Sequence, residues 1–107
     1  YRAVNIAFAN ELAKICRQEN MDVFQLIDIC NRHPRVNILN PGPGVGGHCI
    51  SIDPWFLVGE YGDITALTNC AMKINSHMPD SVFLRIQEIM EARGISGFNR
   101  VGIYGLT

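Results

Sequence analysis

Hydrophobic residues recur every three or four positions over most of the chain, which predicts a mainly α-helical protein. The first such pattern covers residues 4–20, with apolar side chains on one face and charged ones on the other. No capping residue precedes it, so we expect this helix to begin upstream of Tyr1. Asp22 then has the character of an N-cap, and Gln25 would complete a capping box for a second helix ending near Asn31.

Three further helices are predicted after a long interruption of the pattern. Asp53 and Pro54 are typical of an N-cap and a first helical position, and Gly62 would end the helix that they start. Asp63 would cap the next helix, which runs to about residue 77, and Pro79 would kink or break the chain there. The last helix ends at about residue 94.

The final residues have a different character. Val101, Ile103 and Tyr104 lie between glycines and predict a short buried strand over residues 100–106. One strand has no partner to pair with, so we expect it to be the first strand of a second domain. The predicted organisation is therefore a helical domain over residues 1–97 and the start of another domain over residues 98–107.

Composition and charge exclude several classes of protein. The chain has 107 residues, of which 48% are hydrophobic and 18% charged, as in ordinary globular domains. The formal net charge of −1 gives no reason to expect nucleic acid or an anionic membrane as a partner. No apolar run approaches the roughly 20 residues that a membrane span requires. The chain starts at Tyr1 without a Met, so a segment upstream could be missing.

The four cysteines indicate a reducing compartment. An even number would permit two disulfides, but no two cysteines form a Cys-x-x-Cys pair. Cys16, Cys30 and Cys70 lie in helical patterns, where cysteine behaves as a small hydrophobic core residue. We therefore expect reduced thiols in a cytoplasmic protein.

A loop rich in glycine and proline, residues 33–49, ends at the fourth cysteine, Cys49. Glycines allow a backbone to approach a ligand closely, and thiolates are favoured near the start of a helix such as the one predicted at Asp53. Cys49 is thus a candidate nucleophile, although the residues alone slightly favour a surface turn with an incidental buried thiol. No strand precedes the glycines, so they do not form a dinucleotide-binding turn, and no phosphate-binding loop is present. A zinc site that uses Cys49 and nearby histidines lacks the usual ligand spacing, so we expect no metal.

The run Asn-Pro-Gly-Pro-Gly-Val-Gly-Gly-His-Cys-Ile-Ser-Ile-Asp-Pro-Trp-Phe over residues 40–56 resembles the catalytic-cysteine loop of the UDP-glucose/GDP-mannose dehydrogenase family. Residues 4–11 and 31–37 are similar to that family as well. Gly-Gly-His-Cys and Asp-Pro-Trp-Phe fit its N-acetylhexosamine branch. The triplet from His33 to Arg35 favours the members that act on UDP-N-acetyl-D-mannosamine over those that act on the glucosamine epimer.

The resemblance implies that this chain is the helical central domain, through which the family dimerises, followed by the start of a C-terminal Rossmann-like domain that binds UDP. NAD would be bound mainly by an N-terminal domain absent from the chain. The implied reaction oxidises C6 of a UDP-sugar to a carboxylate through a thiohemiacetal and a thioester on Cys49. The alternatives are a UDP-GlcNAc or UDP-glucose dehydrogenase or, for the isolated chain, a dimerisation module without activity. The family's catalytic Lys and Asn would lie upstream of Tyr1.

The resemblance also implies roles for five further residues. Asp53 would order the hydrolytic water or a lysine, unless it is only a helix cap. Arg2 would bind substrate, the alternative being a solvated charge. His33 and Arg35 would reach the substrate across a dimer interface, the alternative being charges at a helix end. Gly46 would let the backbone approach the sugar, unless it only forms a turn.

Overall fold

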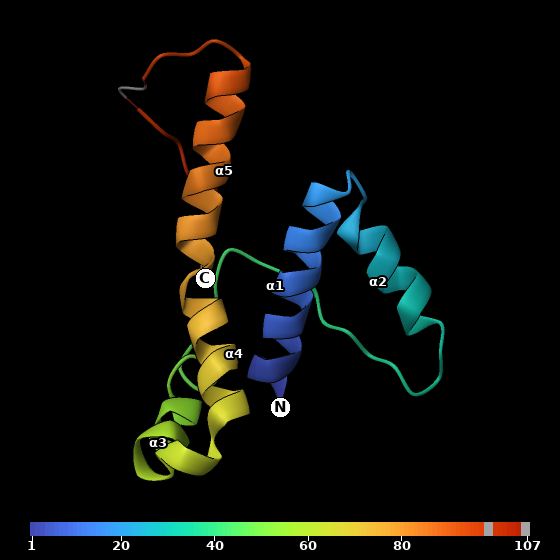
Figure 1. Cartoon of the computed structure of the whole chain (residues 1–107), viewed down its shortest axis with the longest axis vertical. Coiled ribbons are helices and arrows are strands. Elements are labelled where there is room, and N and C mark those ends of the chain that lie inside the picture. Colours follow the sequence, from blue (N-terminus) through green and yellow to red (C-terminus); the bar gives the residue numbers. More distant parts are fainter. Residues whose placement is uncertain (98–99, 106–107) are drawn as a thin grey trace.

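The computed structural model describes residues 1–97 and 100–105 and shows a mainly α-helical chain, as predicted (Figure 1). The described part contains no strand. Its elements are α1 (Arg2–Gln18), α2 (Val23–Asn31), α3 (Asp53–Glu60), a 3₁₀ turn η1 (Gly62–Ile64), α4 (Ala66–Ser76) and α5 (Met78–Ala92). None of these helices is long and apolar enough to cross a membrane.

The helices α1 and α4 form the centre of the structure. They pack against each other more extensively than any other pair, with α2 on one side of α1 and α3 against α4. Figure 1 shows α5 continuing beyond α4 and extending away from the rest. The buried side chains at this centre are mostly small, which lets the two helix backbones approach closely. Those on α1 and α4 are Ala3, Ala7, Ala9, Asn10, Cys16, Ala71, Met72 and Asn75.

The start of α2 confirms one predicted cap and modifies it. The carboxylate of Asp22 accepts hydrogen bonds from the backbone N–H groups of Phe24 at 2.8 Å and Gln25 at 3.4 Å. The Gln25 side chain makes no reciprocal bond to Asp22 in the described part of the chain, so only half of the predicted capping box is formed. Asp22 alone satisfies the first free donors of α2.

The predicted caps of the next two helices are wrong. Asp53 is the first residue of α3 rather than its N-cap, which is Ile52, and no side chain caps this helix. Asp63 lies inside η1, and Thr65 occupies the position before α4. The 3₁₀ turn separates Asp63 from α4, so Asp63 is not its N-cap. The Thr65 hydroxyl makes no capping bond either and donates to the Tyr61 carbonyl at 3.0 Å.

The predicted break at Pro79 is confirmed. The chain leaves α4 at His77, and Pro79 lies in the first turn of α5. Proline is tolerated there because the first N–H groups of a helix have no partner within it.

The expected strand at the end of the chain is not formed over residues 100–105. A strand needs a neighbour for its ladder of hydrogen bonds, and no extended segment of the described chain pairs with these residues. Leu106, also part of the expected strand, and the expected domain boundary at residue 98 lie outside the described residues.

All four cysteines are free. Cys16 is buried, as expected for a core residue, and Cys30 is half-buried. The expectation that Cys70 is a core residue is wrong, because its face of α4 is exposed.

Candidate functional site

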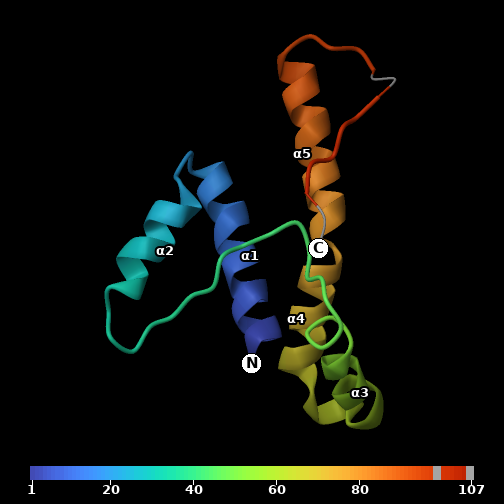
Figure 2. The same cartoon turned by 180° about the vertical axis from the view of Figure 1, so that it is seen from behind.

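The glycine-rich loop between α2 and α3 passes across α1 and leads the chain from α2 to the side of the molecule where α3 and α4 lie (Figure 2). Two asparagines attach its first part. Asn31 donates to the Ile38 carbonyl at 2.9 Å and accepts from the Ile38 N–H at 2.7 Å. Asn5 donates to the Asn37 carbonyl at 2.7 Å and accepts from the Leu39 N–H at 2.9 Å. The side-chain amide of each asparagine thus pairs with one backbone carbonyl and one backbone N–H group of the loop.

A third asparagine attaches the loop closer to the cysteine. The side-chain oxygen of Asn10 accepts from the Gly42 N–H at 2.9 Å, and its nitrogen donates to the Asn75 side-chain oxygen at 3.0 Å. Asn75 in turn donates to the Ala3 carbonyl at 2.9 Å. Asn10 is 0% and Asn75 4% exposed, so the start of the glycine run is joined to α1 and α4 by a buried polar chain.

Cys49 occupies the turn that leads into α3. Its carbonyl accepts from the N–H groups of Ile52 at 3.3 Å and Asp53 at 2.9 Å, so the turn passes directly into the helix. The Ser51 hydroxyl donates to the Gly47 carbonyl, and Gly47 has a φ of +83°, which favours glycine. Cys49 itself is exposed. An exposed thiol one turn before a helix is well placed for nucleophilic attack.

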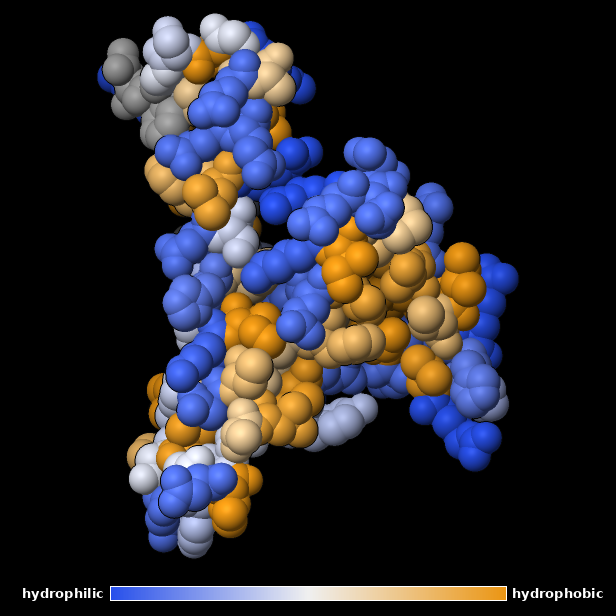
Figure 3. Space-filling model, viewed as in Figure 1, coloured by the Kyte–Doolittle hydropathy of each residue, from blue (hydrophilic) through white to orange (hydrophobic). Residues whose placement is uncertain are grey.

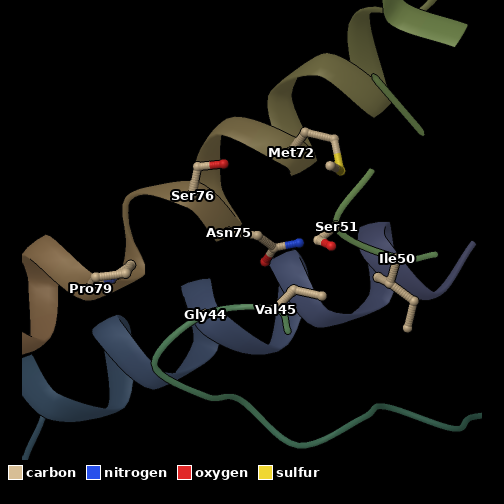
Figure 4. Close-up of a pocket in the computed structure, with 8 residues that line it drawn as sticks. All are labelled: Gly44, Val45, Ile50, Ser51, Met72, Asn75, Ser76 and Pro79. Carbon is tan, nitrogen blue, oxygen red and sulfur yellow. The ribbon is translucent and has the colours of Figure 1, made fainter. Parts of the chain in front are cut away.

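A small pocket of about 170 Å³ lies behind this turn, between the loop and the junction of α4 and α5 (Figure 4). The Asn75 amide forms part of its wall and points from α4 toward α1 and the loop. The lining residues are Gly44, Val45, Ile50, Ser51, Met72, Asn75, Ser76 and Pro79. The loop on which Cys49 lies is therefore not packed tightly against α4 over its whole length.

The structure brings some of the predicted site residues together and separates others. Cys49 and Asp53 lie on one turn, and Gly46 is exposed in the same loop. His33 and Arg35 lie after α2, and Figure 1 shows that segment on the opposite side of α1 from α3. The His33 Nδ1 atom accepts from the Arg35 N–H at 3.2 Å, which orders this corner. Arg2 is exposed at the start of α1.

The described residues do not form a dinucleotide site. Such a site needs a strand, a tight glycine turn and a helix that begins directly after it. Here no described strand precedes the glycines of residues 42–47, and α3 begins only at Asp53. These residues therefore do not form a dinucleotide site of that kind.

The asparagine attachments of the loop were not predicted. The sequence does contain a signal for one of them, Asn10, and for its partner Asn75. Asn10 follows Ala3 and Ala7 on the buried face of α1, and Asn75 follows Ala71 on the buried face of α4. An asparagine at an apolar position needs partners there, since an unpaired buried amide is costly.

Comparison with known proteins identifies the class. Residues 1–77 match the model of the UDP-glucose/GDP-mannose dehydrogenase family, central domain, and the chain belongs to that family. It is 50% identical over all 107 residues to a UDP-N-acetyl-D-mannosamine dehydrogenase of Methanococcus aeolicus, of which it covers 24%. It is 51% identical over 88 residues, 82% of this chain and 21% of the relative, to an NDP-N-acetyl-D-galactosaminuronic acid dehydrogenase of Ralstonia nicotianae.

A solved structure agrees with these relatives. The structure of a UDP-D-ManNAc dehydrogenase from Pyrococcus horikoshii superposes with a TM-score of 0.83 at 40% identity, over 88% of this chain and 22% of that one. The chain spans about a quarter or less of the length of the curated relatives that it matches.

Proposed function

We propose that this chain supplies the nucleophilic cysteine of an NAD-dependent UDP-N-acetyl-D-mannosamine 6-dehydrogenase. The observation that carries the proposal is the place of Cys49, exposed on the turn into α3 at the end of a loop that asparagines attach to α1. Membership of the family and the 50% identity to a UDP-N-acetyl-D-mannosamine dehydrogenase support the substrate. Residues 1–97 would form the central domain and residues 98–107 the start of a UDP-binding domain, in a cytoplasmic enzyme.

The proposed reaction has two oxidations at C6, separated by covalent capture. NAD, held by residues outside this chain, would supply the oxidising power as the hydride acceptor. Between the two oxidations, Cys49 sulfur adds to the C6 aldehyde, forms a C–S bond and passes its proton to the new hydroxyl of the thiohemiacetal. Loss of the second hydride and of the hydroxyl proton leaves a thioester on Cys49. Water then attacks the thioester carbon, the C–S bond breaks, and the carboxylate and the thiol are released.

The other candidate residues receive roles in the same proposal. Asp53 would orient the attacking water. Its carboxylate is available for this role because it makes no capping hydrogen bond to α3. Arg2 and the backbone at Gly46 would contact the substrate of their own subunit. His33 and Arg35 would contact the substrate of a neighbouring subunit, which is consistent with their place on the other side of α1 from α3.

Replacing Cys49 tests the proposal directly. In the full-length protein that contains this chain, Cys49→Ser should abolish carboxylate formation from UDP-N-acetyl-D-mannosamine and NAD. Cys70→Ser is the matched control, because Cys70 is also exposed but lies on α4, and it should retain activity. Carboxylate formed at an unchanged rate by Cys49→Ser would refute the proposal.

The substrate is tested separately by a panel of UDP-sugars. UDP-N-acetyl-D-mannosamine should give the highest kcat/KM, with UDP-GlcNAc and UDP-glucose as the alternatives. A relative at 51% identity is named for an N-acetylgalactosaminuronic acid, so the N-acetylgalactosamine nucleotide belongs in the panel. A clear preference for another sugar would overturn the substrate but leave the role of Cys49 standing.

A second function, self-association, is favoured by the outer faces of α1 and α2. Figure 3 shows hydrophobic side chains gathered over these two helices. Phe8, Ile15, Phe24 and Ile29 are 49%, 53%, 57% and 63% exposed. Large apolar side chains grouped on one surface are typical of an interface. Light scattering of the full-length protein should show at least a dimer, and Phe8→Glu with Ile15→Glu should shift it toward the monomer; a monomeric parent protein would exclude this function.

A further inference from the structure

The path of the glycine-rich loop is set by side chains rather than by its own backbone. From residue 37 to residue 48 no backbone group bonds to another backbone group within residues 1–97 and 100–105. The loop is attached instead by Asn31 at Ile38, by Asn5 at Asn37 and Leu39, and by Asn10 at Gly42.

The attachment at Gly42 is the last of these before Cys49. The next fixed point is the turn into α3, where the Gly47 carbonyl accepts from the Ser51 hydroxyl and the Cys49 carbonyl accepts from N–H groups at the start of the helix. The span between the two contains four of the chain's ten glycines, counting Gly42, so its backbone has unusual freedom. A Cβ built on Gly47 meets nothing within 4 Å, so the backbone at that point is held by its bond to Ser51 and not by packing around its Cα. The position of the thiol therefore depends on how firmly Asn10 holds the upstream end.

The orientation of the Asn10 amide is determined by a chain of hydrogen bonds in which each donor and acceptor is fixed by the next. The Ala3 carbonyl can only accept, so Asn75 must present its nitrogen to it and its oxygen to Asn10. Asn10 must then donate to Asn75, which leaves its own oxygen for the Gly42 N–H. Both amides are buried, and no buried side-chain polar atom of the described residues lacks a partner. The network thus presents an acceptor to the loop in one fixed orientation.

We infer that Asn10, oriented by Asn75, is a positioning residue for Cys49, and this inference rests on the proposed function. By holding Gly42, Asn10 places the glycine span so that the thiol meets the C6 aldehyde. Loss of this bond lets the span shift, and a nucleophile displaced by about 1 Å can lose a hundredfold in rate. The first oxidation, which precedes the capture by Cys49, does not need the thiol.

The two oxidations can be separated in a single turnover of the full-length protein with UDP-N-acetyl-D-mannosamine and NAD. The time course of NADH formation gives the rate of each hydride transfer. Asn10→Ala should slow the second hydride transfer about tenfold or more relative to the first. Ile27→Ala is the matched control for stability, because Ile27 is 3% exposed on α2 and does not contact the loop through any hydrogen bond. It should lower the melting temperature and leave the ratio of the two rates unchanged. Equal slowing of both steps by Asn10→Ala would overturn the inference.

A second variant decides the matter if Asn10→Ala does not fold. Asn75→Ala leaves Asn10 able to bind Gly42 but frees its orientation, so it should slow the second step selectively, by a smaller factor. An unchanged ratio in a folded Asn75→Ala protein would then overturn the inference. Cys49→Ser separates the two proposals. If it retains the second oxidation, the proposed function is wrong. If it loses that step while Asn10→Ala keeps the normal ratio, only the positioning role is wrong.

Discussion

The side chains of Asn10 and Asn75 join α1 to α4 through a hydrogen bond of 3.0 Å between residues 65 positions apart. They are the two buried polar residues of the described chain. Each also binds a backbone group, Asn10 the Gly42 N–H and Asn75 the Ala3 carbonyl. The pair therefore links the packing of the two central helices to the path of the loop that carries Cys49.

The bond between Asn10 and Asn75 predicts a non-additive effect on stability. Asn10→Ala or Asn75→Ala should each lower the free energy of unfolding by about 1–3 kcal/mol, because each leaves a buried partner unsatisfied. The double variant should lose less than the sum of the two, with a coupling of about 0.5–3 kcal/mol. Thermal denaturation of the protein and its three variants measures the cycle. Strictly additive losses would mean that the two amides do not depend on each other.

Most of the helical architecture could be predicted from the sequence, because local patterns determine it. The spacing of apolar residues located α1, α2, α4 and α5, and Asp53, Pro54 and Gly62 located α3. Asp22 and Pro79 act at the positions expected of a cap and a breaker. The errors at Asp53 and Asp63 arose where a turn shifted the start of a helix by a few residues. Capping rules identify suitable residues but not which of several adjacent turns is formed.

The attachments of the loop could not be predicted in the same way. Those of Asn5 and Asn10 join segments that are far apart in the sequence, Asn5 with Leu39 and Asn10 with Gly42. A pattern along the chain shows that Asn10 lies on a buried face, but not which backbone group it meets there. Cys49 was a candidate because its glycine loop and the following Asp53-Pro54 are local features.

The half-formed capping box at α2 predicts unequal effects of its two residues. Asp22→Ala should cost about 1 kcal/mol, because the carboxylate accepts from the Phe24 and Gln25 N–H groups. Gln25→Ala should change the free energy of unfolding by less than about 0.5 kcal/mol, since the Gln25 side chain makes no hydrogen bond to Asp22. Thermal denaturation of the two variants compares them. Equal losses would show that the reciprocal bond forms in solution.

Two glycines of the loop should respond differently to alanine. Gly47 has a φ of +83°, so Gly47→Ala should cost about 1–2 kcal/mol through backbone strain, although a new Cβ has open space around it. Gly44 has no such φ, and its Cβ would lie 3.8 Å from Pro79 Cγ, an ordinary contact. Gly44→Ala should therefore be neutral or slightly stabilising. Melting temperatures of the two variants test this contrast, and a larger loss for Gly44→Ala would contradict it.

Asp53 offers a way to separate chemistry from folding. Since it does not cap α3, Asp53→Asn removes only a favourable charge in the first turn and should cost less than about 1 kcal/mol. If its carboxylate orients the hydrolytic water, the same change should slow thioester hydrolysis at least about tenfold. The acyl-enzyme on Cys49 would then accumulate and appear in the intact mass of the protein during turnover. Asp63→Asn is the control, an exposed acid in η1, and should show no such accumulation. A large loss of stability in Asp53→Asn without any acyl-enzyme would instead assign Asp53 a structural role.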